Sequence, residues 1–314
     1  MPSKSNWLAL GIGLAALVVW ASIWSIAEAP HDLVRKEKQS VTVLFAGDIM
    51  LDRNVAAWRE SDPAPMFAGV ADVFNQADYR VANLEGTVTT NSSIARQNSK
   101  ILRFTFDPSF TETALKPLHL SAVSLANNHA LDFGEFGYDD TIAWLDAHSI
   151  QHFGQPYNDT GKLSTVLHTK LGDICLMGYM GVWGGSTTNT VSAIEALRPS
   201  CWRVVVFAHW GIEYQTSASP EQVAAAHAFV DAGADVVIGA HPHVVEPEET
   251  YAGHAIFYSL GNFMFDQEFS PEVQKGLMVQ VDFGAEKTCF TPIPVGISHA
   301  TTAALAPLDS LCLS

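Results

Sequence analysis

Positive charge is scarce in this sequence. Its 17 lysine and arginine residues face 33 aspartate and glutamate residues, which gives a formal net charge of -16. The basic residues are scattered and form no patch, so nucleic acid is not expected as a partner, because binding to its phosphates needs clustered cations. An anionic ligand would need a local positive centre, such as a metal ion.

Cysteine is also rare. Cys175, Cys201, Cys289 and Cys312 show no CxxC spacing and none accompanies a histidine cluster, so they are not expected to bind metal. Two alternatives remain open for them. In an oxidising compartment they could form up to two disulfides, of which Cys289–Cys312 would tie down the C-terminal tail; otherwise they are buried free thiols.

Signatures of three common enzyme classes are missing. There is no GxSxG motif around Ser259, no GxxxxGK[ST] phosphate-binding loop and no GxGxxG dinucleotide motif. An ATP-driven ligation step is therefore not expected of this chain. If a polymer is ligated, another subunit should carry the nucleotide.

The chain has no proline-rich or glycine-serine linker after residue 40 and no repeat of fixed period. Its 314 residues are 48% hydrophobic, which favours one large domain over two independent ones. The predicted organisation is an N-terminal stub (residues 1–6), a transmembrane anchor (7–27), a juxtamembrane linker (28–40), a main domain (41–298) and a C-terminal tail (299–314).

The anchor is predicted from the uncharged run between Trp7 and Ala27. As a helix, this run would just cross a hydrocarbon core about 30 Å thick. A cleaved signal peptide is the alternative, because Ala27-Glu28-Ala29 has a small-x-small form. Pro30 would follow that cut, however, and the apolar run exceeds the usual core of a signal peptide. An uncleaved transmembrane helix is therefore expected.

Polar residues recur where apolar, strand-like runs end. The run from Val41 to Ala46 stops at Asp48, and the run from Arg203 to Ala208 ends at His209. Three further runs end at Glu85, at Asn128 with His129, and at His241 with His243. Ligands of α/β sheets collect beyond the carboxyl ends of the strands, so these five strand ends predict one shared site.

Helical patterns separate several of these runs. Tyr138, Ile142 and Leu145 have the spacing of one helix face, and a second helix begins at Ser219-Pro220 and closes at Gly233. Strands that alternate with helices predict an α/β fold. The last runs have no helix between them and suggest antiparallel strands at Ala255–Ser259, Gly276–Asp282 and Phe290–Val295. The sheets should therefore be mixed.

Each polar residue has an ordinary explanation when it is taken alone. Asp48 could cap a turn, and Glu85 could be a surface carboxylate. His209 alone would more often be a core histidine, while His241 and His243 could be two loop histidines. Coincidence explains poorly why all of them stand at strand ends of one α/β pattern. A metal site is therefore predicted.

The ordered set resembles the metallophosphoesterase signature, in which an aspartate, a bridging carboxylate, an asparagine-histidine pair, a lone histidine and a histidine pair hold two metals. More narrowly, residues 41 to 283 are similar to the CapA family, because six motifs match it in order along the chain. The motifs are Gly47-Asp48-Ile49-Met50-Leu51, Asn83-Leu84-Glu85, Ala126-Asn127-Asn128-His129-Ala130-Leu131-Asp132, His209-Trp210-Gly211-Ile212-Glu213-Tyr214, Gly239-Ala240-His241-Pro242-His243 and Tyr258-Ser259-Leu260-Gly261-Asn262-Phe263. The resemblance implies an α/β, metallophosphoesterase-like layered sandwich of mixed sheets flanked by helices.

The resemblance also implies how metals would be held. One or two divalent ions are expected, with Asp48, Glu85 and His243 at the first position and Glu85, Asn128, His209 and His241 at the second. Oxygen and imidazole ligands without thiolates suit manganese, iron or zinc. Asp52 and Glu213, if they lie close by, would reduce the positive charge of the loaded site.

Two residues depart from the wider superfamily. Met50 stands where a histidine usually ligates the first metal, and Glu85 replaces the usual bridging aspartate. Both are usual in CapA proteins. The loss of one nitrogen ligand leaves the first position weaker than the second.

Two functions are open for such a site, and the resemblance supports a role in capsule formation more than it supports either chemistry. In the first, a metal lowers the pKa of water, which attacks a phosphoester or an amide of an acidic polymer while His129 assists the leaving group. In the second, the same site binds carboxylates of a growing polymer and guides it outward without cleavage. Either function would belong to poly-γ-glutamate capsule synthesis or export.

The resemblance further implies a place in the cell. The chain is expected in the cell membrane with a single span, a cytoplasmic N-terminal stub and an extracytoplasmic main domain. Its expected partners are the membrane, other subunits of a capsule polymer synthase or export complex, and an anionic polymer or phosphoester substrate.

Overall fold

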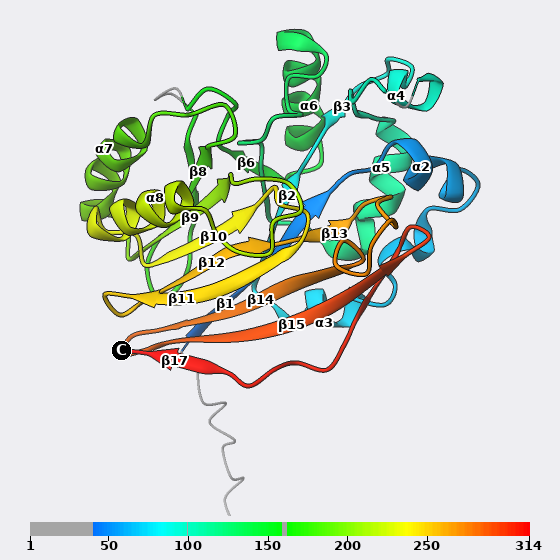
Figure 1. Cartoon of the computed structure of the whole chain (residues 1–314). Helices are drawn as coiled ribbons and strands as arrows, with labels where there is room; N and C mark the ends of the chain where they lie inside the picture. The colour runs from blue at the N-terminus through cyan, green and yellow to red at the C-terminus, as the bar shows by residue number, and fades with distance from the viewer. Residues whose placement is uncertain (1–39, 99, 159–161) are drawn as a thin grey trace, which may run out of the picture. The chain divides into compact units, whose positions relative to one another are not determined.

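The computed structural model describes residues 40–98, 100–158 and 162–314. Two packed β-sheets form the centre of this part of the chain (Figure 1). The predicted anchor from Trp7 to Ala27 lies outside the described residues. Within them, no helix is long and apolar enough to cross a membrane.

The first sheet is mixed. Its parallel part consists of β1 (Ser40–Ile49), β2 (Tyr79–Leu84), β5 (Ala122–Ser124) and β6 (Gln151–Phe153). On the other side of β1, the antiparallel strands are β14 (Lys275–Gly284), β15 (Thr288–Ser298) and β16 (Thr301–Ala304). Two short strands complete it: β13 (Asn262–Met264) pairs with β1, and β17 (Leu311–Leu313) pairs with β15.

The second sheet is also mixed. Its parallel strands are β8 (Ile174–Met180), β9 (Arg203–His209), β10 (Val236–Ala240) and β12 (His254–Leu260). Its edges are the antiparallel strands β7 (Ser164–Leu167) and β11 (Val245–Tyr251). A separate pair, β3 (Thr87–Val88) and β4 (Thr105–Phe106), lies apart from both sheets.

The alternation of side chains along the strands explains the layers. On β1, Val43 and Phe45 point into the core between the two sheets, whereas Leu44 and Ala46 point to a second core on the outer face. The ring of Phe45 lies 6.4 Å from that of Phe207 on β9, which joins the sheets. Both faces of β1 are therefore buried, as its continuous apolar run predicts.

Helices cover the two outer faces (Figure 1). The first sheet carries α2 (Arg53–Arg59), α3 (Ala71–Gln76), α5 (Pro108–Leu115) and α6 (Gly134–Ala147), and the short α4 (Ile94–Gln97) lies near α2. The second sheet carries α7 (Thr187–Leu197) and α8 (Pro220–Asp231). Helix α8 begins at the predicted Ser219-Pro220 with a complete capping box between Ser219 and Gln222. The predicted α/β sandwich of mixed sheets is confirmed.

Two details of the fold go beyond the predicted pattern. Residues Ala255–Ser259 lie in β12, which is antiparallel to β11 but parallel to β10. The reason is that β11 turns back at the sheet edge, so that β12 inserts between β11 and β10. The predicted tail (299–314) also contributes strands β16 and β17 to the first sheet, because β15 offers both of them a free edge.

The four cysteines form two disulfides. Cys289 bonds Cys312, its partner in the β15–β17 register, and Cys175 on β8 bonds Cys201. The first bond ties the C-terminal strand to the sheet, as one of the two sequence alternatives expects. The alternative of free thiols does not hold within this structure.

We expect alkylation of the native, non-reduced protein to modify no cysteine. After reduction and unfolding, all four cysteines in the sequence should react. Mass spectrometry of the alkylated chain measures both states. Labelling of all four before reduction would contradict the disulfide pairing.

Candidate metal centre

The predicted ligands come together where the parallel strands of both sheets end. Asp48 lies at the end of β1 and Glu85 directly follows β2. His209 ends β9, and His241 and His243 follow β10. These five side chains are buried, although they come from segments nearly 200 residues apart in the chain. Asn128, which follows β5, is half-buried beside them.

Glu85 occupies the middle of this cluster. Its Oε1 lies 3.9 Å from His209 Nε2 and 3.9 Å from His243 Nε2. It lies 4.0 Å from His129 Nε2 on the side of α6. Two groups of ligand-type atoms are present, and within each group the atoms lie within 4.8 Å of one another: Glu85, His241 and His243 form one group, and Asp48, Glu85 and His209 form the other. Glu85 belongs to both groups, as a bridging carboxylate would.

The distances do not divide the histidines cleanly between two metal positions: Asp48 lies 3.4 Å from His243 Nδ1, in line with the predicted first position, and 3.9 Å from His209 Nδ1. His209 lies in one group with Asp48, while His241 lies in the other with His243. Asn128 Oδ1 is 2.7 Å from His209 Nε2, so it joins the side of His209. Which histidine serves which metal position stays a prediction.

The cluster carries unmet hydrogen-bonding capacity. Both carboxylate oxygens of Glu85 and the Nδ1 atom of His241 are buried and have no hydrogen-bond partner. A buried polar atom without a partner costs about 1–3 kcal/mol, and more when it is charged. Such atoms at the centre of a cluster of imidazoles and carboxylates fit a divalent cation, which would satisfy them together.

Burial also sets the protonation of these groups. It raises the pKa of Glu85 well above its usual value, with further contributions from Asp48 and Glu213. It lowers the pKa of His209 well below its usual value and that of His241 to about 4, in each case helped by a neighbouring histidine. Neutral imidazole is the form that binds metals, so both histidines are ready to ligate at neutral pH.

The backbone around the histidine pair is strained. His241 has a φ of 97° and His243 a φ of 59°, on either side of Pro242. Such conformations of non-glycine residues cost about 1–3 kcal/mol each and concentrate at functional sites. The strain is offset in part because the backbone amide of His241 donates a hydrogen bond of 3.1 Å to Asp48 Oδ2.

Asn262 orients His243. The amide nitrogen of Asn262 donates to Gln267 Oε1 and to the carbonyl of Val273, so its Oδ1 is the free acceptor. His243 Nδ1 lies 3.0 Å from that oxygen and therefore donates to it. The Nε2 atom of His243 is thus left without a proton and faces Glu85.

Asn83 and Asp132 also orient side chains of the cluster. Asn83 Nδ2 donates to Asp48 Oδ1 at 2.7 Å and lies 3.2 Å from His209 Nδ1. Asp132 Oδ2 accepts from His129 Nδ1 at 2.9 Å, which leaves His129 Nε2 facing the cluster. The roles of Asn83, Asp132 and Asn262 were not predicted from the sequence, although all three residues stand in the motifs that were singled out there.

Met50 lies outside the cluster. Its side chain is buried in the core under the first sheet, and its sulfur accepts a hydrogen bond of 3.0 Å from the amide of Asp52. The thioether therefore does not replace the missing nitrogen ligand.

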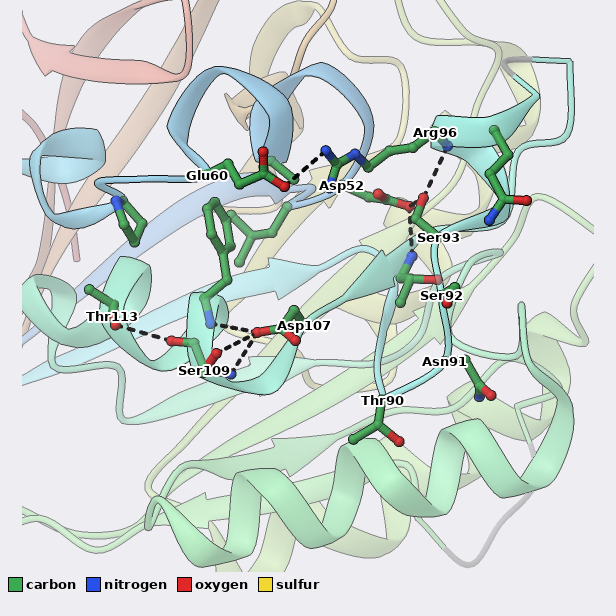
Figure 2. Close-up of a pocket in the computed structure, with 16 residues that line it drawn as sticks. Asp52, Glu60, Thr90, Asn91, Ser92, Ser93, Arg96, Asp107, Ser109 and Thr113 are labelled. Carbon is green, nitrogen blue, oxygen red and sulfur yellow. Dashed lines mark hydrogen bonds and ion pairs between the residues drawn. The ribbon is translucent and has the colours of Figure 1, made fainter.

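The two other acidic residues near the motifs differ in their positions. The Asp52 carboxylate turns away from the cluster, toward Ser93 and Thr105 (Figure 2). The charge of the exposed Glu213, in contrast, helps to raise the pKa of Glu85.

Comparison with known proteins places the chain among bacterial proteins of capsule synthesis. The model of the family described as "Bacterial capsule synthesis protein PGA_cap" matches residues 42–267. A PGA biosynthesis protein CapA from Bacillus subtilis is 29% identical, and the match covers 96% of this chain and 83% of that protein. The capsule biosynthesis protein CapA of Bacillus anthracis is also 29% identical, over 83% of this chain and 69% of that protein.

Two solved structures are similar at a lower level. A hypothetical protein from Thermus thermophilus is 19% identical with a TM-score of 0.49, over 87% of this chain and 100% of that one. A purple acid phosphatase from yellow lupin is 10% identical with a TM-score of 0.41, over 88% of this chain and 54% of that one. The assignment rests on the family match instead, which spans more than two thirds of the sequence. By that match, the chain belongs to the bacterial capsule synthesis protein PGA_cap family.

Proposed function

We propose that this protein is a membrane-anchored, extracytoplasmic component of poly-γ-glutamate capsule synthesis or export, with a divalent metal centre that acts on the anionic polymer or on a phosphoester. The observation that carries the proposal is Glu85, whose two unpartnered oxygens lie buried among three histidines that face it. An external location is supported by the two disulfides, because such bonds persist in oxidising compartments.

The residues of the centre would have two different roles. Asp48, Glu85, Asn128, His209, His241 and His243 would hold one or two ions. When bound, such ions supply a positive charge and Lewis acidity. His129, held through Nδ1 by Asp132, keeps its Nε2 free at 4.0 Å from Glu85 Oε1. When its imidazole carries a proton on both nitrogens, His129 can pass the Nε2 proton to a leaving group from there.

A second function is favoured by Met50. A methionine supplies no nitrogen ligand to the first metal position, and the burial of Met50 in the core keeps its sulfur away as well, which weakens the case for a complete two-metal hydrolase. A centre with one well-held ion can still bind carboxylates of an acidic polymer. The protein would then guide the polymer outward without cleaving it.

One pair of assays separates the two functions. The hydrolase should turn over a generic aryl phosphate when loaded with manganese or zinc, and Asp48→Ala should abolish this turnover. The binding module should bind poly-γ-glutamate by calorimetry without any turnover. A loaded protein that neither cleaves the ester nor binds the polymer would contradict both functions.

A further inference from the structure

Tyr214 packs against one of the predicted metal ligands. The centre of its ring lies 6.1 Å from that of His243, and Phe269 contacts it in a T-shaped arrangement at 5.0 Å. Tyr214 is 42% exposed, whereas His243 is buried. A ligand that approaches the metal centre from solvent can therefore reach the tyrosine.

The backbone of Tyr214 is strained like that of the histidine pair. Its φ of 66° lies in the left-handed region, which a non-glycine residue rarely adopts. Its amide donates a hydrogen bond of 2.8 Å to the carbonyl of Pro242, which stands between His241 and His243. Strained residues of this kind concentrate at functional sites. The strain therefore marks Tyr214 as a part of the same site.

A chain of hydrogen bonds fixes the direction in which the Tyr214 hydroxyl can act. His243 Nδ1 donates to Asn262 Oδ1, and Asn262 Nδ2 donates to Gln267 Oε1. The remaining group of Gln267 is its Nε2, which donates to the Tyr214 hydroxyl oxygen at 3.0 Å. Because this oxygen accepts from Gln267, its own proton is left for another acceptor.

Charged neighbours show where this hydroxyl lies. Burial and the carboxylate of Glu213 raise the pKa of Tyr214, while the charges of Arg53 and Glu85 act on it more weakly. The influence of Glu85 means that the hydroxyl lies near the middle of the metal centre. Glu213 is exposed, so a ligand can replace it as the acceptor of the Tyr214 proton at little cost.

We propose that the Tyr214 hydroxyl donates a hydrogen bond to an anionic oxygen of a ligand held at the metal centre. The inference rests on the proposed function, in which this centre attracts a carboxylate or a phosphate. Tyr214 is then a ligand-binding residue, whose neutral donor orients the anion. The same donor serves a carboxylate and a phosphate, so it fits both functions proposed for the centre.

Inorganic phosphate is the probe for this proposal, and calorimetry with the zinc-loaded protein measures its affinity. Tyr214→Phe keeps the ring and removes one donor to a charged acceptor, so phosphate should bind roughly 10–100 times more weakly. The metal content of this variant should equal that of the wild type, because the hydroxyl is not a ligand. Equal phosphate affinity in both proteins, loss of metal from Tyr214→Phe, or no phosphate binding by the wild type would overturn the proposal.

A double variant separates contact with the ligand from support of Gln267. Tyr214→Phe leaves the Nε2 donor of Gln267 without its partner, whereas Gln267→Leu/Tyr214→Phe removes that donor as well. The double variant should bind phosphate as weakly as Tyr214→Phe, and Gln267→Leu alone should bind it more tightly than the double variant. Recovery of wild-type affinity in the double variant would refute a contact between Tyr214 and the ligand.

Tyr251→Phe is the matched control. The Tyr251 hydroxyl also donates to a carboxylate, that of Asp231 at 3.3 Å, but Tyr251 stands at the other end of β11 from His243. Its removal should leave the phosphate affinity unchanged. A loss as large as that in Tyr214→Phe would refute a specific role of Tyr214.

Two larger ligands separate this inference from the proposed function. If Tyr214→Phe weakens phosphate binding, but the wild type neither binds a short γ-linked glutamate oligomer nor cleaves an aryl phosphate, the proposed function fails and the role of Tyr214 stands. If the wild type binds the oligomer, and Tyr214→Phe binds both the oligomer and phosphate as tightly as the wild type does, the proposed function stands and the role of Tyr214 fails.

Discussion

Glu85→Gln should remove all tightly bound metal from the protein. The glutamine has the same shape, but it offers one neutral oxygen where the carboxylate faces His209, His243 and His129 within about 4 Å. Because Glu85 belongs to both groups of ligand atoms, both positions should empty together. Elemental analysis after loading with manganese or zinc and dialysis measures the ions that remain per chain.

Variants of single ligands test how the ions are divided. The partition implied by the family resemblance predicts that Asp48→Ala empties only the first position and His209→Ala chiefly the second. Asp48 also stands in one group of ligand atoms with His209, and if these two residues share an ion, both variants should lose that same ion. The double variant Asp48→Ala/His209→Ala decides between the two possibilities. It should lose two ions if Asp48 and His209 hold different ions, and one ion if they hold the same ion.

A histidine outside the cluster supplies the control. His227 on α8 pairs with Glu249 at 3.0 Å, so His227→Ala should leave the metal content unchanged. A wild-type protein that retains neither metal, or a Glu85→Gln variant with full metal content, would refute the proposed centre. One ion per chain that survives Asp48→Ala would favour the binding function over the hydrolase.

The same Glu85→Gln substitution should stabilise the protein when metal is removed by a chelator. In the metal-free fold, both oxygens of Glu85 are buried without partners, and burial raises the pKa of this carboxyl. Replacing a buried carboxyl of this kind by a neutral amide should add on the order of 1–3 kcal/mol to the free energy of unfolding. Thermal unfolding should shift by about 2–4 °C for each kcal/mol.

The stabilisation should depend on pH with a definite sign. Because the folded-state pKa of Glu85 is raised above the unfolded-state value, the folded chain holds a proton that the unfolded chain releases. The stability of the wild type therefore falls as the pH rises above the usual value of 4.5. The advantage of Glu85→Gln should be small near pH 4 and grow toward neutral pH. An advantage that instead shrinks with rising pH would contradict this account.

Glu246 on β11 is the matched control for this effect. It is also buried, one of its oxygens has no partner, and burial raises its pKa to about 7. Glu246→Gln should therefore stabilise the protein at pH 8 more than at pH 4. It should do so with and without metal, whereas Glu85→Gln should be the less stable protein once metal is added, because only the wild type then gains from binding.

Much of the centre could be predicted from the positions of single residues. Asp48, Glu85, His209, His241 and His243 each come directly after an apolar run, and the residues after a parallel strand must lie at the carboxyl edge of its sheet. The supporting residues could not be found in this way. Asn83 lies inside β2 and Asn262 opens β13, so their side chains resemble ordinary strand positions until the two sheets are packed together.

The sequence pattern also could not predict which strands pair with β12 and with the C-terminal strands β16 and β17. A run such as Ala255–Ser259 has the same composition in a parallel and in an antiparallel pairing, and the neighbouring β11 is too exposed to show a clear apolar pattern. Pairing depends on which strand edge is free after the other strands have docked. That information is not local to the run.

The α/β class, the strand-end ligands and the family could all be established from the sequence alone, because they depend on local periodicity and on the order of motifs along the chain. Three features needed the folded structure: Glu85 stands between the histidines, Met50 turns into the core and Asp52 turns toward Ser93 and Thr105. The physical reason is that the direction of a side chain beyond a strand end depends on contacts with distant segments. Here those contacts bring residues of the β1–β2 region against residues at the ends of β9 and β10 in the other sheet.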